Sequence, residues 1–132
     1  MFKDAEKYIA RRSANLDNHP ISHHYDKLYD IIIVIPSYAE FKVIKATLDS
    51  IQNQAVKHTF LVIIVINNEV DRKDNIFTNN KKTHDLIKRY IDAFDINAID
   101  CYSDGNCIDE KKFGVGYARK IGLDIAICNS HK

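Results

Sequence analysis

The chain alternates between continuous apolar runs and segments in which apolar residues recur every three or four positions. Two of the continuous runs, DIIIVI at residues 30–35 and FLVIIVI at residues 60–66, are rich in β-branched residues, and a weaker run covers residues 98–102. A run without polar alternation is typical of a strand that is buried on both faces, which favours a parallel sheet. We therefore predict three buried strands at these positions.

A helix is predicted after each strand, because the apolar residues between the runs share one helical face. The first helix covers about residues 39–54, the second follows a polar loop at residues 67–80, and the last covers residues 115–128. This β-α-β-α-β-α order implies an α/β fold, an open three-layer Rossmann-like parallel sheet with right-handed crossovers. In such sheets ligands bind beyond the carboxyl ends of the strands, so the loops that follow the strands hold the candidate site.

The segments outside this alternation predict the domain organisation. Residues 2–12 carry apolar residues on one helical face and predict an extra N-terminal helix. Residues 13–29 are polar, contain Pro20 and predict a connector. Residues 30–132 then form the α/β domain. A last helix with an apolar face normally returns to a strand, so we expect this domain to stop one strand early.

Composition and charge narrow the function classes. The net charge of +1, with 45% hydrophobic and 28% charged residues, is ordinary for a soluble domain and gives no electrostatic case for nucleic acid. The three cysteines form no C-x-x-C spacing, which predicts packing thiols in a reducing, cytoplasmic setting. The start of the chain lacks a signal-peptide core, and the longest apolar run, at residues 61–66, is too short for a bilayer.

Several familiar site signatures are incomplete in this sequence. The glycines of Gly114-x-Gly116 fit part of the dinucleotide fingerprint, but Arg119 stands where the third glycine belongs, and no P-loop motif occurs. The crowded histidines at positions 19, 23 and 24 have no acidic or cysteine partner in a zinc-binding pattern. These observations leave the strand-end loops as the source of any site.

The loops after the first two strands carry short polar side chains. Ser37 and Glu40 fit a capping box for the following helix. Alternatively, Tyr38 and Glu40 form a wall of a base or ribose pocket, where Tyr38 offers a ring face and Glu40 an acceptor for ribose hydroxyls. Asn67 and Asn68 are typical turn residues. Alternatively, one of their amides pairs with the edge of a base, since an amide both donates and accepts.

The third loop, residues 111–122, combines four basic side chains with glycines at the start of a helix. Lys111 and Lys112 are typical of a solvated basic face. Gly114 lets the backbone approach a ligand closely, and Arg119 is suited to grip a phosphate. We therefore consider Lys112 and Gly114 as further candidates for a phosphate contact.

Three segments together resemble the family 2 glycosyltransferases, which have the GT-A fold. VIPSYAE at residues 34–40 is similar to the family's strand that ends in P-x-Y-N-E, and IIVINN at residues 63–68 stands in the place of a strand that ends in Asp-Asp. GVGYARKIGLDIA at residues 114–126 is similar to the family's helix G-x-x-x-A-R-N-x-G-L-x-x-A and is the most specific of the three. The resemblance covers about residues 30–128 and leaves residues 1–29 outside.

The resemblance implies the N-terminal half of a cytoplasmic GT-A enzyme, possessing a site for a nucleotide-diphosphate sugar that is usually UDP-linked. The complete enzyme would move the sugar to a hydroxyl of an acceptor glycan or lipid-linked glycan of the cell envelope, at the inner face of the membrane. Carried over residue by residue, the resemblance gives nucleotide-binding roles to Pro36, Ser37, Tyr38, Glu40, Asn67 and Arg119, and the amide of Asn68 is a further candidate beside Asn67. This chain departs from the family at Ala39 and Lys120, which replace asparagines, and at Asn67 and Asn68, which replace acidic residues.

The resemblance also implies residues that this chain lacks. A divalent cation, Mg²⁺ or Mn²⁺, would be held by an Asp-x-Asp one strand beyond Ala126, and the catalytic base would follow later. We therefore expect no metal ligand and no catalytic residue here, and no sugar transfer by this chain alone.

Two other hypotheses stay open from the sequence. One is a non-catalytic nucleotide-binding or assembly module of Rossmann-like fold that ends near Lys132, in which the open edge of the first strand would allow self-association. The other is a flavodoxin-like or response-regulator domain. A response regulator needs clustered acidic residues at the end of the first strand, where this chain has Pro36 and Ser37.

Overall fold

The computed structural model describes residues 20–23, 25–109 and 114–129, together with residues 4, 6, 7 and 10, each of which is helical. The rest of the helix predicted at residues 2–12 lies outside the described residues. So do the positions predicted as basic or histidine candidates at 19, 24, 111 and 112.

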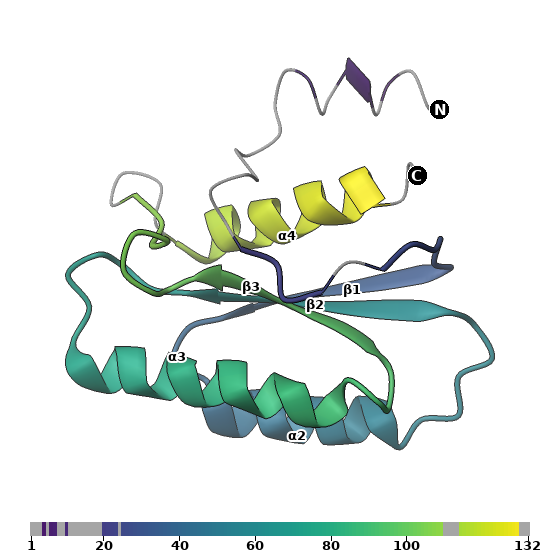
Figure 1. The fold of residues 1–132 in the computed structure, drawn as a ribbon, viewed down its shortest axis with the longest axis horizontal. Coiled ribbons are helices and arrows are strands. Elements are labelled where there is room, and N and C mark those ends of the chain that lie inside the picture. The colour runs from purple at the N-terminus through teal and green to yellow at the C-terminus, as the bar shows by residue number, and fades with distance from the viewer. Residues whose placement is uncertain are drawn as a thin grey trace.

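From residue 31 to residue 129, the described part of the chain alternates between three strands and three helices, as the sequence predicts (Figure 1). The strands are β1 (Ile31–Ser37), β2 (Phe60–Asn67) and β3 (Asp95–Cys101). The helices are α2 (Phe41–Gln52), α3 (Asp74–Ile87), which continues into the 3₁₀ turn η2 (Lys88–Tyr90), and α4 (Val115–Asn129). The strands are parallel, in the order β1-β2-β3. The predicted α/β fold with an open parallel sheet is therefore confirmed.

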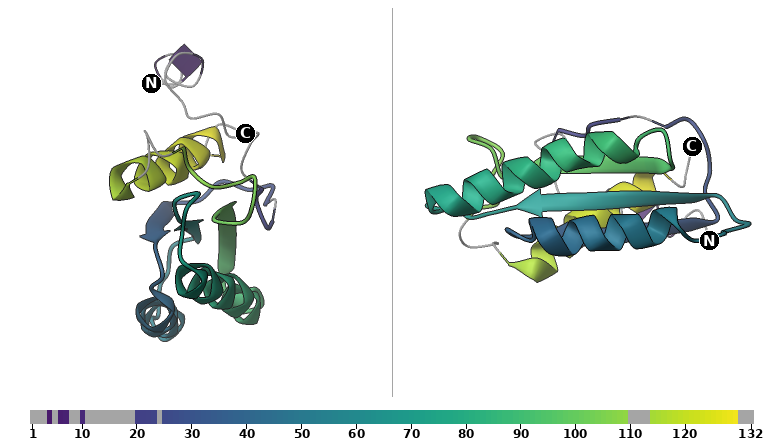
Figure 2. Two further views of the ribbon diagram at one scale, coloured as in Figure 1. Left: turned by 90° about the vertical axis from the view of Figure 1, so that its left-hand side faces the viewer. Right: turned by 90° about the horizontal axis from the view of Figure 1, so that it is seen from below.

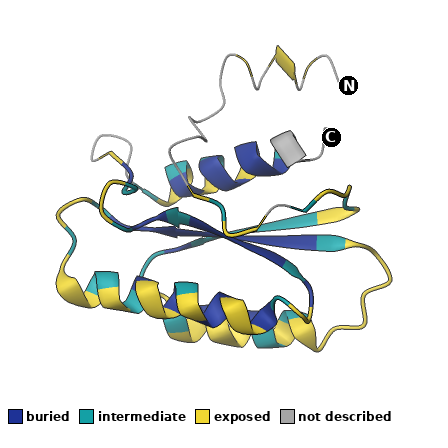
Figure 3. Cartoon of the chain, viewed as in Figure 1, coloured by how far each residue is buried: buried dark blue, intermediate teal, exposed yellow. Residues whose placement is uncertain are grey.

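The elements form three layers, with α2 and α3 on one face of the sheet and α4 on the other (Figures 1 and 2). Each face has its own core, because alternate residues of the buried strand β2 point to opposite sides. Val62, Ile64 and Ile66 pack with the α2 and α3 side, whereas Leu61, Ile63 and Val65 pack with α4. The central strand is buried along nearly all of its length, while the outer faces of α2 and α3 are exposed (Figure 3).

Small residues let α4 lie close against the sheet. Ala118 and Ala126 are buried on its inward face, and Gly122 stands between them. A Cβ atom added at Gly122 would lie 2.3 Å from Val34 Cγ1 and 3.0 Å from Val65 Cγ2. These three positions are the small residues of the helix motif that is most specific for the family resemblance. Close packing of α4 on the sheet is therefore a sufficient physical reason for small residues at these positions.

The segment predicted as a connector pairs with the outer edge of β3. Ile21 forms an antiparallel bridge with Ile99, and the backbone N–H of Ser22 donates to the carbonyl of Ala98 at 3.0 Å. Further along, the Tyr29 hydroxyl donates to Asp95 Oδ2 at 2.7 Å. The chain thus covers the β3 edge, whereas no described residue pairs with the outer edge of β1.

The starts of α3 and β3 differ most from the prediction, and β1 also extends through Pro36 to Ser37. Helix α3 begins at Asp74, inside the predicted polar loop. The prediction missed this start because the buried face of α3 includes Asn80 and Thr83, which interrupt the apolar helical period in the sequence. Strand β3 begins at Asp95, before the predicted residue 98, and the prediction missed this start because Asp95 and Asn97 interrupt the apolar pattern. None of the described helices is long and apolar enough to cross a membrane.

Candidate functional site

A pocket of about 430 Å³ lies at the carboxyl ends of β1 and β2, beside the start of α4. The described residues that line it are Pro36, Tyr38, Glu40, Asn67, Gly114 and Val115. Five of the six come from the residues that the sequence nominates, and Val115 is the addition. Pro36 and Asn67 reach the same pocket because side chains along a strand point alternately to the two faces of the sheet. Both residues continue the set that points to the α4 face.

Asn67 has one fixed orientation in this pocket. Its side-chain nitrogen donates to the carbonyl oxygens of Ser37, at 3.0 Å, and Val65, at 3.3 Å. Because both partners are acceptors, the nitrogen has to lie on this side of the amide. The side chain is 3% exposed, so the group that it can offer a ligand is its carbonyl oxygen. From the sequence, the amide is able both to donate and to accept a hydrogen bond. In the structure its nitrogen is already engaged, so only its oxygen, an acceptor, is left for a ligand.

Tyr38 is held by a residue that the sequence analysis did not nominate. Its hydroxyl donates to Glu69 Oε1 at 2.9 Å. Burial and this hydrogen bond both raise the pKa of Tyr38, so its phenol stays neutral at physiological pH. The Tyr38 hydroxyl proton is thus directed at Glu69, and the Glu40 carboxylate can only accept hydrogen bonds from a ligand. The polar wall described here is therefore made of acceptors.

The capping-box interpretation of Ser37 and Glu40 is wrong. Helix α2 begins at Phe41, Glu40 is its N-cap residue, and no side chain makes an N-cap hydrogen bond from that position. Ser37 is instead the last residue of β1, fully buried, and its hydroxyl has no hydrogen-bond partner among the described residues. The cap comes from α3, where Asn79 Oδ1 accepts the backbone N–H of Phe41 at 3.0 Å.

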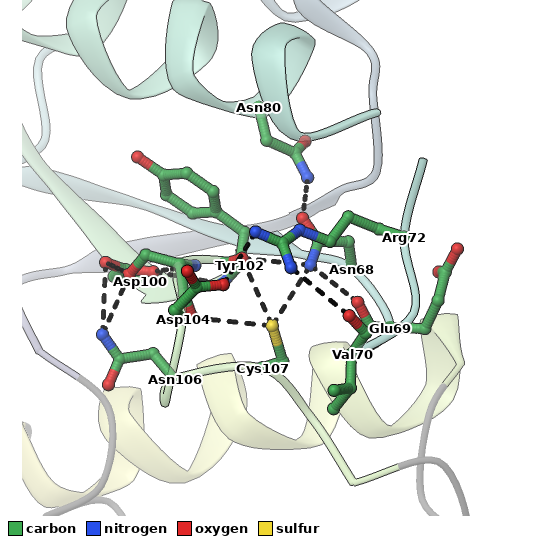
Figure 4. A network of polar contacts seen from close by, with 11 residues as sticks. Asn68, Glu69, Val70, Arg72, Asn80, Asp100, Tyr102, Asp104, Asn106 and Cys107 are labelled. Atoms are coloured by element: carbon green, nitrogen blue, oxygen red, sulfur yellow. Dashed lines mark hydrogen bonds and ion pairs between the residues drawn. The ribbon is translucent and has the colours of Figure 1, made fainter. Parts of the chain in front are cut away.

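Asn68 lies in a buried polar network instead of the pocket wall (Figure 4). Its side-chain nitrogen contacts the carbonyl oxygens of Tyr102 and Glu69, both at 3.0 Å, and Cys107 Sγ at 3.3 Å. Its side-chain oxygen accepts from Asn80 Nδ2 at 3.0 Å. Both ends of the amide are thus engaged, and the side chain is fully buried. The network joins the end of β2 to the end of β3.

Asp100 organises the turn after β3 within the same network. Its carboxylate accepts the backbone N–H groups of Tyr102 and Ser103, at 3.1 and 3.0 Å, and the Ser103 hydroxyl. Burial alone would raise the pKa of Asp100, but these hydrogen bonds outweigh it and hold the pKa below its usual value. The carboxylate is therefore charged and engaged in the turn, where Tyr102 also contacts His84 Nδ1 through its hydroxyl at 2.8 Å.

Arg119 is the basic candidate that the structure describes. Arg119 is exposed on α4 and is not among the residues that line the pocket. Lys112 lies outside the described residues. Gly114 does line the pocket, with a φ of 149° that side-chain-bearing residues rarely adopt. Lys120, which departs from the family pattern, forms an ion pair of 2.7 Å with the buried Asp124.

Sequence reasoning missed the asparagines and the glutamate that hold the pocket loops. The sequence pattern places Glu69, Asn79 and Asn80 in a polar loop. A usable signal was present for Asn80, because it precedes Thr83 and Leu86 by three and six positions on the face that α3 buries. A polar residue on a buried helical face has to find hydrogen-bond partners, which points to a packed polar site.

The cysteines and the acidic residues give no sign of metal or thiol chemistry in the part of the chain that the structure describes. Burial raises the pKa of Cys101 to about 12, and it also raises the pKa of Cys107. No group of three or more His, Cys, Asp or Glu side chains there could hold a metal ion.

Comparison of the chain with known proteins finds no matching protein family, no matching curated protein and no matching solved structure.

Proposed function

We propose that the pocket binds the nucleoside part of a uridine diphosphate sugar, and that the complete protein is a glycosyltransferase that moves the sugar to an acceptor hydroxyl. The observation that carries the proposal is the fixed acceptor of Asn67 in a pocket at the carboxyl ends of parallel strands. Open α/β sheets bind their ligands at this edge. The volume of about 430 Å³ lies within the range of small-molecule sites.

The acceptor wall suits the donor groups of a nucleoside. The N3–H of a uracil ring is a single donor that can meet Asn67 Oδ1, and the two ribose hydroxyls can donate to the Glu40 carboxylate. The ring of Tyr38 offers an apolar face for the base. The Asn67 oxygen and the Glu40 carboxylate thus each have a partner of matching chemistry on the nucleoside.

The proposal assigns the sugar transfer to the complete protein. A divalent cation would neutralise the diphosphate charge and assist its departure. The described residues include no group of ligands that fits such a cation. The role of this chain in the proposal is to bind and orient the nucleoside. The resemblance at residues 34–40, 63–68 and 114–126 supports the assignment to sugar transfer.

Calorimetric titration with UDP tests the proposal, and a modified ligand supplies the control. UDP methylated at N3 keeps the ribose and diphosphate but lacks the donor that Asn67 would accept. Leaving a buried acceptor unpaired costs about 1–3 kcal/mol, so methylation should weaken binding roughly 5- to 150-fold. The protein is identical in both titrations, so its stability cannot explain a difference. Absence of saturable UDP binding, or equal affinity for both ligands, contradicts the proposal.

A further inference from the structure

We propose that Asn79 and Asn80 of α3 are positioning residues of the pocket, which hold the loop of Tyr38, Ala39 and Glu40 in its ligand-binding shape. The inference rests on the proposed function, because it concerns the same pocket. Neither asparagine lines the described pocket wall, so each acts through backbone groups: Asn80 through Ala39 and Asn67, and Asn79 through Phe41.

Asn80 joins the two walls of the pocket through one buried amide. Its side-chain oxygen accepts the backbone N–H of Ala39 at 2.9 Å. Its nitrogen donates to the carbonyl oxygen of Asn67 and to Asn68 Oδ1, each at 3.0 Å. The side chain is fully buried. An amide is required, because a carboxylate has no proton for the two oxygens and an apolar side chain has neither group.

Ala39 needs this support because its backbone is strained. Its φ of 50° lies in the left-handed region, and it is the one non-glycine residue with a positive φ in the described part of the chain. A side-chain-bearing residue persists there only when the surrounding structure holds it. The N–H groups of Ala39 and Phe41, on either side of Glu40, are held by Asn80 and Asn79. The sequence neighbours of Ala39, Tyr38 and Glu40, both line the pocket.

The pair of asparagines therefore fixes where Tyr38 and Glu40 stand relative to Asn67. If the asparagines are removed, Ala39 can relax to a negative φ, and the two wall residues move with it. This effect differs from a general loss of stability. The loss of the loop shape should be corrected by any change that lets position 39 keep a positive φ without the asparagine hydrogen bonds. Glycine adopts a positive φ at no steric cost.

UDP titrations of Asn80→Ala and Asn79→Ala test the inference, with Asn97→Ala as the matched control. Asn97 is an equally buried asparagine, 2% exposed, in the middle of β3 and away from the pocket. Circular dichroism and urea unfolding establish that each variant is folded at the titration temperature. We expect Asn80→Ala to weaken UDP binding at least tenfold, Asn79→Ala to weaken it less, and Asn97→Ala to leave it unchanged. If Asn80→Ala does not fold, Asn79→Ala alone carries the test.

Rescue separates positioning from a purely structural role. Ala39→Gly introduced into the Asn80→Ala or Asn79→Ala chain should recover at least threefold of the lost affinity. Unchanged UDP binding by the folded asparagine variants, or no recovery when Ala39→Gly is added to them, overturns the inference while the proposed function stands. A wild-type chain that does not bind UDP overturns the proposed function, and this inference with it.

Discussion

Gly122 offers a sharp test of how α4 is seated on the sheet, because alanine is otherwise the better helix residue. Where a new methyl group meets nothing, replacing a helical glycine by alanine stabilises by about 0.5–1 kcal/mol. At Gly122 the new Cβ would lie 2.3 Å from Val34 Cγ1 and 3.0 Å from Val65 Cγ2. Both valines are β-branched residues of adjacent strands, with restricted χ1 angles. Overpacking of this kind costs about 1–3 kcal/mol.

The balance of these terms predicts that Gly122→Ala lowers the free energy of unfolding by about 1–2 kcal/mol. Gly116→Ala is the matched control in the same helix, because a Cβ there meets no atom within 4 Å. It should leave the stability unchanged or raise it by up to about 0.5–1 kcal/mol. Urea unfolding followed by circular dichroism measures both variants.

A double variant identifies the contact that is responsible. Val34→Ala removes the nearest methyl groups, so Gly122→Ala should cost less in that background than in the wild-type chain. The reasoning about α4 is refuted if Gly122→Ala proves as stable as Gly116→Ala, or if its cost is the same with and without Val34.

Three further predictions concern backbone strain and pH. Ala39→Gly should raise the free energy of unfolding by about 1 kcal/mol, since it relieves a φ of 50°, and a decrease in urea stability would contradict this. The lowered pKa of Asp100 contributes stability that is present above the unfolded value of about 3.9 and is lost as pH falls through the folded pKa. Asp100→Asn should therefore flatten the acid limb of a plot of urea midpoint against pH, and an unchanged limb would contradict it. Burial raises the pKa of Tyr90 and Tyr102 to about 12, so these phenols stabilise the fold up to about pH 10, and that contribution is lost as pH rises towards 12. A tyrosinate absorbance titration should show a late phase for them, and a single phase near pH 10 would contradict it.

The fold could be predicted from the sequence because its strands are unusually plain. Continuous β-branched runs such as residues 60–66 identify buried parallel strands without any knowledge of their neighbours. The start of α3 was harder, because Asn80 and Thr83 occupy buried positions and weaken the apolar period on which helix prediction depends. The pairing of Ile21 with β3 was not predictable in this way, because it depends on backbone hydrogen bonds.

The site could be predicted only as far as the strand ends determine it. Residues directly after a strand, such as Pro36 and Asn67, reach the carboxyl edge of the sheet whatever the rest of the chain does. The orientation of the Asn67 amide depends on the carbonyl of Ser37, thirty positions away. The cap of α2 likewise comes from Asn79, 38 positions beyond Phe41. Contacts at this separation follow from the packed fold and leave no local sequence pattern.

A ¹H–¹⁵N NMR titration of the chain with UDP tests most directly whether the pocket binds the nucleotide. We expect saturable shifts of the backbone amides of Tyr38, Glu40, Gly114 and Val115, and of the Asn67 side-chain amide. Asn97 on β3, away from the pocket, should stay unshifted. Absence of saturable shifts, or shifts confined to residues away from the carboxyl ends of β1 and β2, would contradict it.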